Sequence, residues 1–278
     1  YEGIYNNDTG LILYLPFHDK SGATAEDLSG QENNGTLTNF DDYSAGYGNT
    51  HDSGWTTYGR PLWSSGKFGK GLAFNGLDDY VDCGNDESLN ITDAITIEAW
   101  LKSNDFAIDN AMICGKEYDY RMVQWNDGLI IHSYDSDGDG TGTSGVDLTA
   151  YTGEWIHFVG ILRKYTGDWT AKTYFNGQPH QESTNSLYDG PRSSTATVKV
   201  GRLGSSHYFN GTIDEVRIYN RALSEEEIRM HYLSELQKYN STQYRFYTNL
   251  STNPYLHKFN IQAIDMAVSY THLTLPTN

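Results

Sequence analysis

The sequence predicts an all-β fold, a sandwich or jelly roll of antiparallel sheets, on three observations. The 278-residue chain is 14% aromatic and contains 22 tyrosines and 28 glycines. Short segments rich in apolar and alternating residues recur about every dozen residues, with turn residues between them. No helical pattern separates these segments until late in the chain, so a parallel sheet with intervening helices is not expected.

Alternation is strictest in residues 94–103, where Ile95 and Ile97 share one face and Thr96 and Glu98 share the other. This period of two is typical of a strand with one buried face. Asn-Gly pairs at 75–76 and 176–177 predict tight turns between strands. The predicted strand segments, in order, are 10–19, 70–84, 94–103, 111–116, 120–125, 128–134, 154–164, 169–179, 196–204 and 208–223.

Three segments do not read as strands. Residues 27–37 are rich in the turn residues Asp, Ser, Gly and Asn. Residues 38–69 show no period and are predicted to form a long loop. Residues 223–239 predict a helix, because Ser224 and Glu227 form a capping box before an apolar stripe.

The pattern divides the chain into a jelly-roll domain (1–236), the start of a small second β-domain or linker (237–267) and a tail (268–278). Within the second part, residues 244–267 read as two further strands. The tail is unrelated to the preceding pattern, and we interpret it as translated adapter sequence without a place in the fold. We expect the chain to be a fragment of a longer multidomain protein.

Charge and composition argue against several classes of function. The chain has 36 acidic and 19 basic residues, a formal net charge of −17. A nucleic-acid partner is not expected, because phosphate binding needs clustered Lys and Arg. The sequence contains no apolar run of about 18 residues, the length that would predict a membrane-spanning helix. The two cysteines, Cys83 and Cys114, are too few for a disulfide scaffold, and the sequence leaves open whether they are bonded or free.

Six motifs follow one another in a recognisable order: DLSGQENNGTL, FNGLDDYVDCG, AITIEAWLK, EWIHFVGIL, YFNGQ and FNGTIDEVRIYNRALSEEEI. Together they resemble the laminin-G-like jelly-roll domain of the concanavalin A-like lectin/glucanase superfamily. The resemblance covers about residues 10–233 and is most specific in its last motif. It implies two curved antiparallel sheets, often a structural calcium ion, and frequently a glycan or protein ligand, although a fold alone does not establish function.

The resemblance also implies a calcium site where the amino-terminal loop meets the last strand. The candidate ligands are Asp27, Asn34, Asp79 and Asp214. Their side chains supply the oxygen atoms that calcium prefers. The alternative is that Asp27 and Asn34 cap turns by hydrogen bonds. For Asp214, which needs a partner if it is buried, the alternative is pairing with Arg217 or Arg221.

The segment YDSDGDGTGTSGVD (134–147) begins like an EF-hand calcium loop, with Asp135, Asp137 and Asp139 at alternate positions. An EF-hand also requires flanking helices and a glutamate at position 12, whereas predicted strands flank this segment and position 12 is Val146. Two alternatives remain. The segment is either a mobile, glycine-rich acidic turn or a calcium- or ligand-binding loop on a jelly roll.

A carbohydrate-binding face is expected on the strands 120–125 and 128–134. Sugars place their C–H faces on aromatic rings while polar side chains bind their hydroxyl groups. The candidate ligand-binding residues are Tyr120, Arg121, Gln124, Trp125, His132 and Tyr134. The alternative is that these aromatic residues belong to the core or to cross-strand pairs.

Catalysis is not expected. The glucanases of this superfamily carry carboxylates at alternate positions on one strand, flanking the glycosidic bond. Here the segment TIEAW offers only Glu98, and the adjacent Asp214 and Glu215 are expected on opposite faces of their strand.

The sequence therefore predicts a non-catalytic carbohydrate-binding or adhesion module of a larger secreted or surface protein, with structural calcium. Its expected partners are a glycan or surface protein and the other domains of the longer chain, and its expected location is extracellular. The alternatives are an architectural spacer without glycan binding and an accessory domain of a glycan-degrading enzyme.

Overall fold

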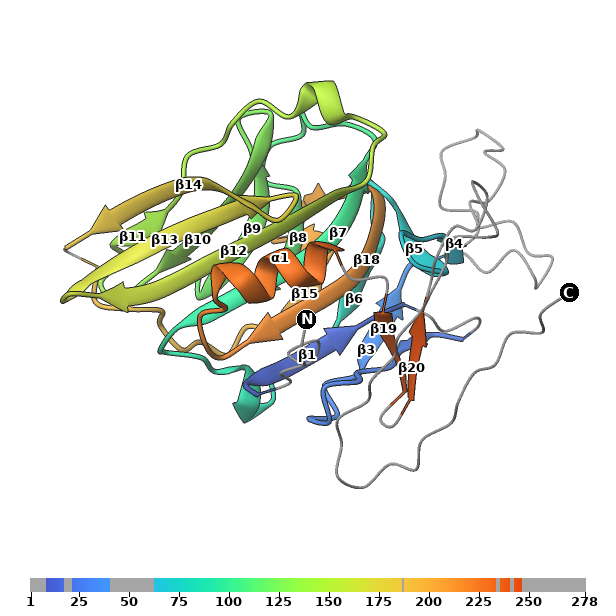
Figure 1. Cartoon of the computed structure of the whole chain (residues 1–278), viewed down its shortest axis with the longest axis horizontal. Coiled ribbons are helices and arrows are strands. Elements are labelled where there is room, and N and C mark those ends of the chain that lie inside the picture. The colour runs from blue at the N-terminus through green and yellow to red at the C-terminus, as the bar shows by residue number, and fades with distance from the viewer. Residues whose placement is uncertain are drawn as a thin grey trace, which may run out of the picture.

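The computed structural model describes residues 9–17, 22–40, 63–186 and 188–233, and only the backbone of 236–240 and 243–246. Within these residues, two large antiparallel sheets pack face to face as a sandwich (Figure 1). We call them sheet A and sheet B. The predicted all-β, two-sheet architecture is confirmed.

Sheet A has eight strands and lies nearer the viewer in Figure 1. Its strands, in spatial order, are β14 (Gln178–Asn185), β13 (Asp168–Phe175), β12 (Ile156–Tyr165), β7 (Ile95–Ser103), β18 (Asn210–Tyr219), β5 (Lys70–Asn75) and β4 (Trp63–Ser65), and β1 (Leu11–Leu15) also pairs with β18. The strand pairs of this sheet are antiparallel.

Sheet B also has eight strands and lies behind sheet A in Figure 1. Its order is β11 (Gly140–Gly142), β10 (Gly128–Tyr134), β9 (Tyr120–Trp125), β8 (Met112–Lys116), β15 (Val198–Val200), β6 (Tyr80–Asp82), β3 (Gly35–Thr38) and β2 (Thr24–Ala25). Short pairs are formed by β16 (Arg202–Leu203) with β17 (His207–Tyr208) and by β19 (Leu236–Asn240) with β20 (Gln243–Phe246). Two 3₁₀ turns, η2 (Glu87–Leu89) and η3 (Thr149–Tyr151), complete the set.

The core fills the space between the sheets. The alternation in β7 is confirmed, because Ile95, Ile97 and Ala99 belong to the central apolar cluster. The sheets approach closely at Gly160 of β12, where a Cβ atom would lie 2.6 Å from the Cβ of Ile131 in β10. Close packing of this kind leaves no room for a side chain at Gly160.

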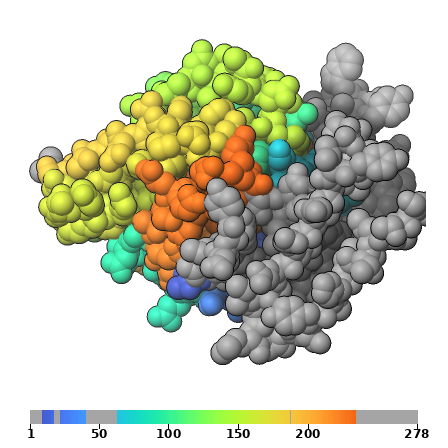
Figure 2. Space-filling view, viewed as in Figure 1, coloured from blue at the N-terminus to red at the C-terminus, as the bar shows by residue number. Residues whose placement is uncertain are grey.

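The helix α1 (Glu225–Leu233) covers part of the outer face of sheet A (Figure 1). Its predicted capping box is confirmed: Ser224 Oγ accepts a hydrogen bond from the Glu227 amide (3.2 Å), and Glu227 Oε2 accepts one from the Ser224 amide (2.8 Å). In Figure 2, the orange residues, which include α1, lie against the yellow strands of sheet A. Lys172 of β13 pairs with Glu225 of α1 at 2.8 Å.

Three local predictions need correction. The helix ends at Leu233, and residues 236–239, expected to be helical, belong to β19. The predicted loop 38–69 contains the end of β3 and the strand β4, while residues 41–62 lie outside the described residues. The Asn75-Gly76 turn does not close a hairpin, since β5 belongs to sheet A and β6 to sheet B.

Further predictions concern the ends of the chain and the cysteines. Of the expected second domain, the structure describes only the backbone of β19 and β20. The rest, including 247–267 and the tail 268–278, lies outside the described residues. Cys83 and Cys114 are both buried and carry free thiols, so, of the two possibilities that the sequence left open, the structure has no disulfide between them.

We expect Gly160→Val to destabilise the sandwich by about 1–3 kcal/mol, because the added side chain must push Ile131 and its sheet away. The measurement is the free energy of unfolding in urea. Thr184→Val, on the exposed face of edge strand β14, is the control and should change stability by less than about 0.5 kcal/mol. Equal unfolding midpoints for G160V and wild type would show that the sheets are further apart here.

Candidate functional site

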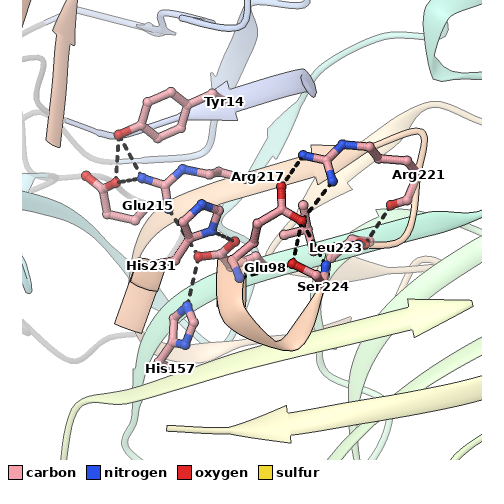
Figure 3. Close-up of polar contacts among 11 residues, drawn as sticks. Tyr14, Glu98, His157, Glu215, Arg217, Arg221, Leu223, Ser224 and His231 are labelled. Carbon is pink, nitrogen blue, oxygen red and sulfur yellow. Dashed lines mark hydrogen bonds and ion pairs between the residues drawn. The ribbon is translucent and has the colours of Figure 1, made fainter. Parts of the chain in front are cut away.

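A cluster of ionisable side chains lies on the outer face of sheet A beneath α1 (Figure 3). At its centre, the fully buried carboxylate of Glu98 has three partners from three elements. Its Oε1 lies 2.8 Å from Nε2 of His157 in β12 and 3.3 Å from Nη1 of Arg217 in β18. Its Oε2 lies 2.8 Å from Nδ1 of His231 in α1. One buried carboxylate therefore links the helix to three strands of the sheet.

A β-bulge in β18 brings a second carboxylate to this cluster. Asp214 pairs with Trp100 and Arg217 with Glu98, so two residues of β18 oppose one residue of β7. Glu215, inside the bulge, has a φ of 55°. The prediction that Asp214 and Glu215 point to opposite faces is wrong, because the extra residue resets the alternation and Glu215 contacts the same Arg217 as Glu98.

Glu215 and its partners extend the cluster toward β1. Glu215 Oε2 accepts hydrogen bonds from the Tyr14 hydroxyl (2.7 Å) and from Arg217 Nη2 (2.5 Å). Arg217 also lies over the Tyr14 ring, with its Cζ 4.3 Å from the ring centroid. The guanidinium thus holds two carboxylates and one aromatic ring from three strands.

Burial and charge move the pKa values of these carboxyl groups in opposite directions. Burial opposes ionisation of Glu98, but His231, the hydrogen bond from His157 and Arg217 outweigh it and hold its pKa well below the ordinary range. Burial raises the pKa of Glu215 to about 7, against the opposing effects of Arg217 and Tyr14. Burial and the charge of Glu215 raise the pKa of Asp214 well above its ordinary value.

This cluster is well suited to anchoring α1. Its two glutamates are fully buried, and His157 is buried as well. Tyr232 of α1 stacks on Trp100 at 5.6 Å between ring centroids. General acid–base chemistry requires groups that a substrate can reach, whereas the side chains of Glu98 and Glu215 have no exposed surface.

The predicted calcium ligands Asp27 and Asn34 lie together, but their side-chain oxygen atoms accept hydrogen bonds from the protein itself. Asp27 Oδ1 accepts hydrogen bonds from the amides of Tyr14 (2.8 Å) and Ser29 (2.9 Å), and its Oδ2 accepts them from the Ser29 hydroxyl and the Asn33 amide. Asn34 Oδ1 accepts one from the Asp27 amide at 2.8 Å. This arrangement matches the alternative of turn capping.

The other two predicted ligands lie elsewhere. Asp214 Oδ2 accepts a hydrogen bond from the Phe68 amide (3.0 Å). Asp79 Oδ2 accepts one from the Asn75 amide (2.8 Å) in the turn after β5. Among the described residues, no three His, Cys, Asp or Glu side chains are grouped so that they could hold a metal ion.

The acidic loop after β10 folds around its first aspartate. The buried Asp135 accepts hydrogen bonds at Oδ1 from the amides of Asp137 (3.0 Å) and Asp139 (2.9 Å), and at Oδ2 from Asp189 (3.2 Å). Asp137 and Asp139 are exposed. The loop joins β10 to β11 as a hairpin, so the EF-hand reading fails for lack of helices.

The outer face of sheet B carries polar and charged side chains in register. Lys199 of β15 pairs with Gly115 of β8, and Gly115 pairs in turn with Arg121 of β9. On its other side, Arg121 pairs with His132 of β10. Directly paired residues share one face of a sheet, so these side chains form one row across four strands. We call this face the polar face of sheet B.

Aromatic rings accompany the cations at one end of this face. Arg121 lies over the Tyr134 ring (5.4 Å), and Arg192 lies over Tyr118 (4.8 Å), measured from Cζ to the ring centroid. The rings of His132 and Tyr134 pack edge to face, with their centroids 4.5 Å apart. Tyr118 is 50% exposed and has a φ of 69°, an uncommon conformation for a bulky residue.

Four of the six predicted ligand residues lie on the polar face: Arg121, Trp125, His132 and Tyr134. Tyr120 and Gln124 do not. Both are fully buried, and they bond to the carbonyl oxygens of Leu89 and Asp105. They point to the other side of β9, because successive residues of a strand alternate.

Sequence reasoning missed two members of this region, Lys199 and Arg192. Lys199 reaches the face only through the pairing of β15 with β8, which joins residues about 80 positions apart. The signal available in the sequence was the alternation of Val198, Lys199 and Val200, but not which strand lies beside them.

Comparisons with known proteins agree with this architecture. A laminin G family model, described as the concanavalin A-like lectin/glucanases superfamily, matches residues 74–229. No curated protein matches the sequence. Domain 4 of AbnA, an extracellular arabinanase from Geobacillus stearothermophilus solved in complex with arabinotriose, has a TM-score of 0.55 and 20% identity, over 80% of this chain and 97% of that domain.

Longer toxin domains share the fold as well. The receptor-binding domain of the botulinum neurotoxin C/D mosaic serotype has a TM-score of 0.58 and 15% identity over 82% of this chain. The serotype D ligand-binding domain, solved with N-acetylneuraminic acid, has a TM-score of 0.57 and 16% identity over 83% of this chain. This chain spans 53% of each of these two domains. At such identities the likeness shows the fold alone.

We expect the stability of the protein to fall between pH 5 and pH 8 through Glu215. A carboxyl whose folded pKa is about 7, above its unfolded value, contributes stability that is fully present below the unfolded pKa and is lost as the pH rises through 7. Glu215→Gln removes this titration. Wild type should therefore lose about 1–3 kcal/mol relative to E215Q over this range, measured by urea unfolding at both pH values.

The control for this measurement is Glu182→Gln, at a carboxylate that is 55% exposed in strand β14. It should follow the wild-type pH dependence. If wild type and E215Q lose stability in parallel between pH 5 and pH 8, Glu215 is already ionised in the fold at pH 5 and its pKa is not raised.

Proposed function

The chain belongs to the concanavalin A-like lectin/glucanase superfamily, and from this premise we propose that it is a non-catalytic carbohydrate-binding module. Its ligand lies on the polar face of sheet B. The observation that carries the proposal is the gathering of solvent-facing aromatic rings and planar polar side chains on this face, around Arg121, His132 and Tyr134. Rings of this kind accept the apolar faces of sugars, and the polar groups between them bind hydroxyl groups.

The contrast between the two outer faces supports this location. On sheet A, α1 covers Glu98 and Trp100, which are both buried. On sheet B, Trp125 is 39% exposed and Tyr118 is 50% exposed, and no described helix covers them. Sheet A also has an exposed tyrosine, Tyr165 (60%), at the end of β12, so the contrast between the faces lies in the helix that covers sheet A.

The named ligands of similar structures point the same way. The arabinanase domain, nearly all of which this chain matches, is complexed with arabinotriose, and the longer serotype D domain is complexed with N-acetylneuraminic acid. We infer a role as an accessory or adhesion domain outside the cell, with a glycan as partner. No helix in the described part of the chain is long and apolar enough to cross a membrane.

We expect Tyr118→Ala and Trp125→Ala each to weaken glycan binding by about 1–2 kcal/mol, because each removes an exposed ring from the proposed contact surface. Binding is measured on a glycan array and then by calorimetry with the strongest ligand. Tyr165→Ala, at a 60% exposed tyrosine of sheet A, is the matched control and should bind as wild type does. Absence of binding by folded wild-type protein would favour the architectural alternative.

Calcium stays a prediction, and we propose that it acts on stability. The exposed carboxylates of Asp137 and Asp139 are the acidic groups of the β10–β11 loop that a cation can reach. Calcium should raise the Tm relative to chelator, since an ion that binds only the folded state stabilises it. Asp137→Asn with Asp139→Asn should abolish the rise. An unchanged Tm in wild type would exclude a structural calcium ion.

A further inference from the structure

We propose that the polar face of sheet B binds an anionic carbohydrate, a glycan whose carboxylate or sulfate groups contact Arg121, Lys199 and Arg202. This inference rests on the proposed function and names the class of its ligand. The observation behind it is a group of cations without acidic partners, on one face of a protein whose formal net charge is −17.

Arg121 and Lys199 form no ion pair with any residue that the structure describes. In contrast, Lys172, Arg217 and Arg221 each lie within 4 Å of a carboxylate. Other described cations, such as Arg163 and Lys164 at the end of β12, also lack an ion pair with the described residues. What distinguishes Arg121 and Lys199 is that they lie in one row of one sheet, where one anionic group could contact both.

The strand register places the two cations close together. Lys199 and Arg121 flank Gly115, which pairs with both and has no side chain between them. Two strand spacings separate their Cα atoms by about 10 Å. Both side chains are long and only half-buried, so one carboxylate or sulfate group could contact both.

A local change of backbone direction adds Arg202 to this group. Gly201 has a φ of 86°, and a Cβ atom there would lie 2.4 Å from the ring of Phe74 in the core. Position 201 therefore faces inward and interrupts the alternation after Val200. Arg202 lies on the polar face, with its Cζ 4.5 Å from the Tyr80 ring centroid and 5.5 Å from that of Tyr208.

Two acidic groups of this region, Asp82 and Asp119, are already engaged by the protein, whereas Glu117, Asp137 and Asp139 form no ion pair with any described residue. Asp82, opposite Lys199, accepts hydrogen bonds from the Gly84 amide (2.9 Å) and the Thr197 hydroxyl (3.1 Å). The buried Asp119 is shared between Lys116 and Arg192, at 3.5 and 3.4 Å. The acidic loop that begins at Asp135 bounds the face at one end.

His132 lies beside Arg121 in this row and is partly buried. Burial and the charge of Arg121 lower its pKa to about 4, so the imidazole is neutral at physiological pH. A neutral imidazole beside the Tyr134 ring can bind a sugar hydroxyl, while Arg121 holds a charged substituent. Cations in contact with rings, as in Arg121 with Tyr134 and Arg202 with Tyr80, beside the apolar pair of Val123 and Ile130, fit a charged sugar better than a bare phosphate or an acidic peptide.

The test compares charged and neutral forms of the same saccharide by calorimetry on the full chain. The probes are oligogalacturonate with its methyl ester, for carboxylates, and a heparin-derived oligosaccharide with its desulfated form, for sulfates. For at least one saccharide, the charged form should bind with an affinity about tenfold or more higher than that of the neutral form. Added salt should reduce this difference in affinity. The double variant R121Q/K199Q should remove this preference.

The matched control is R163Q/K164Q, which makes the same change of charge at the end of β12 in sheet A and should keep the preference. Equal affinity for charged and neutral saccharides would overturn this inference and leave the proposed function standing. Oligoglutamate bound as tightly as the charged saccharide would overturn the assignment to carbohydrate. Failure to bind any saccharide would overturn the proposed function as well.

Discussion

The buried carboxylate of Glu98 is the interaction on which the arrangement of sheet A depends. It comes from β7, and it joins β12 through His157, β18 through Arg217 and α1 through His231. A carboxylate in this position would be costly without such partners, so burial makes each of them necessary. The same arginine stabilises Glu215, and through it the bulge in β18 and the contact with Tyr14 of β1.

This network has a consequence for where a ligand can bind. Once α1 is joined to Glu98 and stacked on Trp100, the outer face of sheet A is closed around its charges. The outer face of sheet B has no such helix in the described part of the chain, and its cations and rings remain half-buried or exposed. The two faces thus differ in cover: α1 lies on part of one, and no described helix lies on the other.

Local signals in the sequence predicted the parts of the fold that depend on neighbouring residues. The alternation in β7 and the capping box of Ser224 and Glu227 are both confirmed, because a strand's period and a helix cap involve residues only a few positions apart. The end of α1 was not predicted correctly. The apolar stripe continues to Leu236, but that residue belongs to a strand.

The sequence by itself determined the all-β class, the order of most strands and the neighbourhood of the candidate ligand face. Only the tertiary structure decided which side of each strand faces out. In β9, Met122 and Val123 are both apolar, so alternation could not show that Tyr120 and Gln124 point into the core. The bulge at Glu215 and the place of Lys199 beside Arg121 depend on strand partners distant in the sequence, and no local pattern encodes such pairing.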